Sequence, residues 1–135
     1  MAEKSLYVEL ISPENRLYDG EAAWVKLPGI EGSFAVLVGH APLLSLLGPG
    51  EVTIKTHQEE KRFVIEGGFV EVSQDRLTIL VEGAFLPQDI DKDKVQQELR
   101  SLYESVVSGE NALQAREKKA AILRAQLRSA SFLVG

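Results

Sequence analysis

The hydrophobic period of the chain changes once, at Leu86-Pro87, and this change limits which folds the chain can adopt. Before it, short runs alternate apolar and polar residues, as in "SLYVEL" (5–10), "EVTIKT" (51–56) and "LTILVE" (77–82). Such alternation is typical of strands with one buried face. After it, apolar residues recur at the spacing of a helix. A strand-rich region is therefore followed by a helical one.

Turn-forming sequences separate the strand-like runs. They are "SPEN" (12–15), "DG" (19–20), "GPG" (48–50), "GG" (67–68) and "SQD" (73–75). Short strands at this spacing, without a long helical pattern between them, indicate an antiparallel β-sandwich or barrel. We expect residues 1–87 to form a β-sandwich domain.

The region from 88 to 135 predicts an α-helical hairpin, so the fold class is α+β. One face of the first helix is expected to carry Val95, Leu99, Leu102 and Val106; Asp89, Asp91 and Asp93 cluster at its start, where the helix dipole favours acids. After a break at "SGEN" (108–111), the second apolar stripe comprises Leu113, Ala120, Leu123, Leu127, Ala130 and Val134. A hairpin this small has little core of its own. It must dock on the β domain, on a partner, or on each at different times.

Charge divides the chain in the same way. Residues 1–110 have a net charge of −9, whereas residues 111–135 have +4. The basic residues of that end are Arg116, Lys118, Lys119, Arg124 and Arg128. One explanation is an acidic partner. The other is that cations are favourable near the C-terminal end of a helix, and both explanations remain open.

Motifs that would indicate catalysis are missing from this sequence. Gly29, Gly32 and Gly39 lack the spacing of a dinucleotide-binding loop and read as turn glycines. His40 and His57, with no cysteine, do not predict a metal site, and His40 fits a turn. No nucleophile–base signature is present. The chain is therefore predicted to be a non-enzymatic interaction module.

Two other classes of partner are also disfavoured. The "DIDKD" run (89–93) fails as a calcium loop because Lys94 replaces the required glycine. Nucleic acid is not expected, since the chain is acidic with a pI of about 5.1. No apolar run approaches the roughly 18 residues of a membrane span, and we recognise no secretion signal.

Three blocks resemble the ε subunit of bacterial and chloroplast F-type ATP synthases, whose mitochondrial counterpart is called δ. They are "LPGIEGSFAVLVGHAPLLSLLGPGEV" (27–52), "IEGGFVEVSQDRLTILVEGA" (65–84) and "DIDKDKVQQEL" (89–99). The first block departs from that family's pattern at Ala35, where glycine is usual, and at Val38, where proline is usual. The likeness extends over nearly the whole chain.

The resemblance implies a rotor subunit of the central stalk that couples proton-driven rotation to ATP synthesis. Its β domain would bind the γ subunit and sit on the ring of c subunits, with Glu31, Gly32, Ser33 and His40 as the contact candidates. Its hairpin would fold down on the sandwich or extend into the α/β catalytic head and inhibit ATP hydrolysis. The basic residues 116, 118, 119, 124 and 128 would then contact an acidic segment of β.

Some relatives bind ATP through an I-D-x-x-R-A motif and two arginines of the last helix. Asp91, Arg124 and Arg128 match that pattern, whereas Lys94 and Val95 replace the Arg-Ala pair. Lysine keeps the charge but loses the bidentate fork of arginine. We therefore expect nucleotide binding to be weak or absent, and no other cofactor.

The resemblance also implies a peripheral location on the cytoplasmic face of the bacterial plasma membrane, reached only through the complex. An alternative is a free-standing ligand-binding β protein whose helical arm acts as a lid. That alternative requires a sizeable apolar pocket with convergent polar groups.

Overall fold

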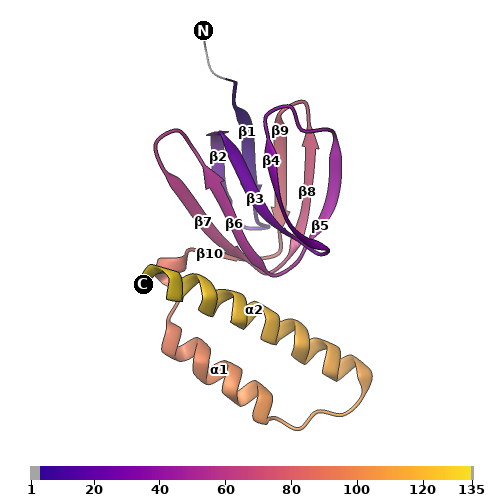
Figure 1. Ribbon diagram of the computed structural model, residues 1–135. Coiled ribbons are helices and arrows are strands. Elements are labelled where there is room, and N and C mark those ends of the chain that lie inside the picture. The colour runs from indigo at the N-terminus through magenta and orange to yellow at the C-terminus, as the bar shows by residue number, and fades with distance from the viewer. Residues whose placement is uncertain (1–3, 135) are drawn as a thin grey trace.

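The computed structural model describes the backbone of residues 4–134 and the side chains of residues 4–130. Within this range the chain forms ten strands, then a 3-10 turn and two helices (Figure 1). The strands are β1 (Leu6–Ile11), β2 (Arg16–Ala22), β3 (Trp24–Gly29), β4 (Gly32–Leu37), β5 (Leu43–Leu47), β6 (Gly50–Lys55), β7 (Glu60–Ile65), β8 (Gly68–Ser73), β9 (Arg76–Val81) and β10 (Ala84–Phe85). The turn η1 (Pro87–Asp89) leads into α1 (Lys92–Glu104) and α2 (Glu110–Val134).

The strands form one strongly curled sheet in the order β10-β7-β6-β3-β5-β8-β9-β1-β2, with β4 on the other edge of β3. The two halves of this order meet only at the residue pair Gly29–Leu47 of β3 and β5 among the described strands. Because so little backbone joins them, the halves can fold over one another around a common core. The predicted sandwich is confirmed in this form.

One strand pair departs from the antiparallel prediction. β1 and β9 run parallel, with Val8 opposite Leu77 and Leu10 opposite Ile79. These strands are distant in the sequence. A long crossover joins them, because a parallel pair cannot be connected by a hairpin turn.

The core takes the alternate residues of the strands, as the period of two predicts. Leu6, Val8 and Leu10 of β1 are fully buried, and so are Val52 and Ile54 of β6. Both halves of the sheet contribute to a single apolar cluster. The remaining alternate residues point outward, and several of those are also apolar.

The first helix begins where the acidic cluster predicts but ends earlier than expected. The side chain of Asp91 accepts a hydrogen bond from the backbone N–H of Lys94 at 3.2 Å, which caps α1. Ser105 has extended backbone, and its Oγ donates to the carbonyl of Leu102 at 2.6 Å. Val106, predicted on the apolar face, therefore lies beyond the helix and is 97% exposed.

The second helix lies across one end of the sheet, antiparallel to α1 (Figure 1). Ala120, Leu123 and Ala130 of the predicted stripe are buried, whereas Leu113 is 42% exposed. A second set, Ile122, Ala125, Gln126 and Ser129, is buried as well. The predicted stripe accounts for only part of the buried surface of α2, because α2 packs on α1 and on the sheet at once. Val134 lies outside the residues whose side chains are described.

Neither helix combines the length and apolarity needed to cross a membrane, as far as the described residues extend.

Candidate functional site

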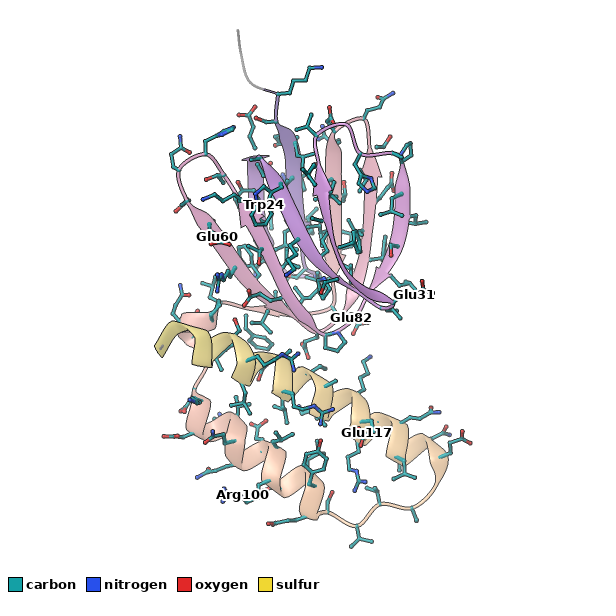
Figure 2. All side chains as sticks on the ribbon, viewed as in Figure 1. Trp24, Glu31, Glu60, Glu82, Arg100 and Glu117 are labelled. Carbon is teal, nitrogen blue, oxygen red and sulfur yellow. The ribbon has the colours of Figure 1, made fainter. Side chains whose placement is uncertain are left out.

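The turn between β3 and β4 carries three of the predicted contact residues. Glu31, Gly32 and Ser33 are exposed there, and Figure 2 shows Glu31 at the end of the sheet that faces the helices. Gly32 has φ +138°, a conformation that residues with a side chain rarely adopt. A Cβ on Gly29 would lie 2.6 Å from the Gly32 carbonyl oxygen, so the turn needs both glycines.

The structure separates His40 from these three residues by the length of β4. His40 lies in the loop after that strand, with Nδ1 2.6 Å from the Ala41 carbonyl oxygen. The loop is tied to the β8–β9 turn, because Gly39 N–H donates to Asp75 Oδ1 at 2.7 Å. His40 and Glu31 do line the two ends of one groove of about 550 Å³ between β4 and β5.

An exposed apolar surface that the sequence reasoning missed lies on the outer face of β5, β8, β9 and β1. Strand register places Leu46, Phe69, Leu80 and Ile11 side by side across these strands. We call these four residues the outer apolar row. Leu46 is 63% exposed, and its neighbour Leu44 is 70% exposed. The signal was present in "LLSLL" (43–47), where both faces of a strand are apolar.

A charged cluster borders the outer apolar row on β1, β2 and β9. Glu9 lies 3.0 Å from Arg76 and 3.7 Å from Arg16. The hydroxyl of Tyr7 donates to Asp19, and this bond is the main cause that lowers the pKa of Asp19. The same bond raises the pKa of Tyr7. These ion pairs order the polar border of the apolar surface.

The four nucleotide-binding candidates are not brought together in this structure. Asp91 caps α1, and with Lys94 it lines a cavity of about 310 Å³ between the hairpin and the sheet. Arg128 lines a separate cavity of about 440 Å³. Arg124 donates to the hydroxyl of Tyr103, far along α1. Phosphate groups at any one of these places would meet only part of the set.

The basic residues of α2 likewise point to different neighbours. Arg116 Nη1 donates to the carbonyl of Ser105 at 3.3 Å, and its buried Nε has no hydrogen-bond partner among the described residues. Lys118 pairs with Glu82 of the β9–β10 loop at 3.6 Å. Lys119 lines the groove between the helices. In the folded hairpin these cations do not form one basic face.

One polar contact joins α2 to the outer face of the sheet. Ser129, 4% exposed, donates from Oγ to Oε2 of Glu51 on β6 at 2.6 Å. The residues are 78 positions apart, and no local motif indicates their contact.

A cavity of about 640 Å³ lies between β2, β7 and β10. Leu17, Phe63, Phe85 and Leu86 supply apolar walls, and Lys61 and Arg62 supply cations. Among the residues whose side chains are described, neither α1 nor α2 lines this cavity. The lid that the ligand-binding alternative requires is therefore not seen in the described part of the two helices. Among the described residues, no group of His, Asp and Glu side chains could hold a metal ion.

Comparison with known proteins places this geometry among ATP synthase subunits. Residues 5–87 match the family model described as ATP synthase, Delta/Epsilon chain, beta-sandwich domain. The chain is 41% identical over 123 residues to the ATP synthase epsilon chain of Maricaulis maris, covering 91% of each chain.

Two solved structures share the fold. One is a chain of the Euglena gracilis mitochondrial ATP synthase, with a TM-score of 0.81, 22% identity, and coverage of 90% of this chain and 78% of that one. The other comes from the central stalk and c-ring of the Tetrahymena thermophila mitochondrial ATP synthase, with a TM-score of 0.76 and 17% identity. That match covers 96% of this chain and 99% of the other.

Proposed function

Because the chain belongs to the ATP synthase delta/epsilon family, we propose that it is a non-catalytic central-stalk subunit that couples rotation to ATP synthesis and restrains ATP hydrolysis. In this role the β-sandwich of residues 1–87 is the anchor, and the hairpin of residues 88–135 is the regulatory arm. The protein is peripheral, at the cytoplasmic face of the bacterial plasma membrane, and meets the membrane only through the complex.

We assign the binding site for the γ subunit to the outer apolar row. The observation that carries this assignment is the exposure of Leu44 and Leu46, 70% and 63%, beside Phe69 at 39%. A contiguous apolar surface bordered by polar residues is typical of a protein interface. The border here is the cluster of Glu9, Arg16 and Arg76, which adds charges that can fix the register of a partner.

We assign the contact with the ring of c subunits to the β3–β4 turn. Glu31, Gly32 and Ser33 are exposed in this turn, and Glu31 lies at one end of the sheet (Figure 2), where a short polar loop of another subunit would bind. His40 belongs to the far end of the groove. We propose that His40 supports the loop geometry, and that Glu31 supplies the charge at the ring.

The α/β head is assigned to the hairpin in an extended form. Arg116 and Arg124 donate to Ser105 and Tyr103 within the folded hairpin, so they become fully available to an acidic partner when those contacts break. Lys118 is already 62% exposed beside Glu82. The structure therefore corresponds to the non-inhibiting form in this proposal. Weak or absent ATP binding agrees with the separation of Asp91 and Lys94 from Arg124 and Arg128.

The test of the γ assignment is Leu46→Glu, which places a charge in the outer apolar row without entering the core. We expect at least about a tenfold loss of affinity for the isolated γ subunit, measured by calorimetry, since burying an unpaired charge at an interface is costly. Leu37→Glu is the matched control, because Leu37 is 56% exposed on β4 of the other half of the sheet. Equal loss from both variants would contradict the assignment.

A further inference from the structure

Among the described residues, two polar contacts of very different quality link α2 to the sheet and its β9–β10 loop. The ion pair of Lys118 with Glu82 has both side chains 62% exposed. Exposed pairs of this kind contribute little, because water and salt screen them. The bond from Ser129 to Glu51 is instead largely covered, and it is short, at 2.6 Å.

The sheet prepares Glu51 for this contact. Oε1 lies 3.4 Å from the hydroxyl of Thr53 and 3.8 Å from Nε of Arg62, both on the sheet. Oε2 is the oxygen that accepts from the helix. Since Thr53 and Arg62 favour one orientation of the carboxylate, little side-chain freedom remains to be lost when α2 docks.

The rest of the contact that α2 makes on this side is with β6, β7 and η1. Ala125 lines one cavity with Thr53 of β6, and Ile122 is also buried on α2. A hydrogen bond to a charged acceptor is stronger than one between neutral groups. Its loss would therefore change the stability of the docked state noticeably, while the sheet keeps its own core.

We infer that Glu51 and Ser129 form a latch that sets how often the hairpin leaves the sheet. The inference rests on the proposed function, in which the released hairpin reaches the α/β head. Arg128 is the residue before Ser129 in the same helical turn, and it lines the same cavity as Glu51. The latch thus keeps Arg128 at the sheet, whereas the extended form presents this cation to its partner. The ratio of released to docked hairpin can shift only if the contacts of the two states differ in free energy.

Ser129→Asp is the variant that opens the latch. It places a second carboxylate against Glu51, where like charges repel. We expect the ratio of released to docked hairpin to rise at least about tenfold, and Ser129→Ala to raise it by a smaller factor. Adding Glu51→Gln to Ser129→Asp removes the repulsion and restores most of the docked population. Lys118→Ala is the matched control on the same helix and changes the ratio less than about twofold.

The readout is a distance in the isolated full-length chain. The sequence contains no cysteine, so cysteines introduced at the exposed residues Gln58 and Gln114 carry the only two spin labels. Pulsed electron paramagnetic resonance then reports docked and released populations. A distance distribution that Ser129→Asp leaves unchanged would overturn the latch, as would failure of Glu51→Gln to restore it.

The same variants in the cognate α/β/γ complex separate the latch from the proposed function. If Ser129→Asp releases the hairpin and also deepens inhibition of ATP hydrolysis, both stand. If the hairpin is released and hydrolysis is unchanged, the latch stands and the inhibitory role of the hairpin fails.

Discussion

At the scale of single residues, the hydrogen bond between Tyr7 of β1 and Asp19 of β2 makes a contribution to stability that depends on pH. The hydroxyl of Tyr7 donates to the carboxylate of Asp19, and Arg16 lies 3.0 Å from the same carboxylate. Both interactions favour the ionised form, so the pKa of Asp19 is lowered in the folded chain.

A lowered carboxyl pKa contributes stability above the pKa of the unfolded chain, about 3.9, and that contribution is lost as the pH falls through the folded value. Tyr7→Phe removes the main cause. We expect the unaltered chain to be slightly more stable than Tyr7→Phe at pH 7, with the difference shrinking below about pH 4. Urea unfolding at pH 7 and pH 3 measures it. A difference that stayed constant or grew at pH 3 would contradict the assignment.

Individual residues also show what the sequence could not predict. Turn glycines and the Asp91 cap follow from local chemistry, so they were predictable. The contact of Ser129 with Glu51 requires the docked position of α2, which no local pattern contains. The separation of His40 from Glu31 follows from the direction of β4, although both residues were candidates for the same ring contact.

At the scale of elements, the N-cap of α1 matters because few side chains of this helix are buried. It has 13 residues, of which Val95 alone is buried. Asp91→Ala removes the cap and costs about 1 kcal/mol of helix stability. Hydrogen exchange of the α1 amides should quicken by roughly fivefold, while the amides of the sheet remain protected.

Gln96→Ala is the control for that prediction, because Gln96 is exposed on the same helix. Faster exchange of α1 in both variants, or in neither, would show that Asp91 does not stabilise the helix.

Elements were predictable in kind but not in pairing. The period of two gave the buried faces of β1 and β6, and the helical period gave one face of α2. The parallel pair of β1 and β9 and the single join at Gly29–Leu47 depend on how distant segments meet. The second buried face of α2 consists of Ile122, Ala125 and Ser129. Because Ser129 is polar and Ala125 is small, the spacing of large apolar residues in the sequence does not reveal this face.

At the scale of the whole molecule, the proposed function gives the sheet and the hairpin different roles: the sheet anchors the subunit and the hairpin regulates hydrolysis. The apolar cluster of the sheet is built from strand residues, so the sheet has its own core. The hairpin has few buried side chains apart from those it places on the sheet and between its two helices. Such an element can change its partner without unfolding the sheet, which is the property a regulatory arm needs.

The central claim is that the sheet anchors the subunit and the hairpin restrains hydrolysis. The most direct test is ATP hydrolysis by the cognate α/β/γ complex, measured with the full-length chain and with a chain ending at Gln88. We predict that both chains bind γ and that only the full-length chain lowers the hydrolysis rate. Equal inhibition by both chains, or binding of both without inhibition by either, would contradict the account.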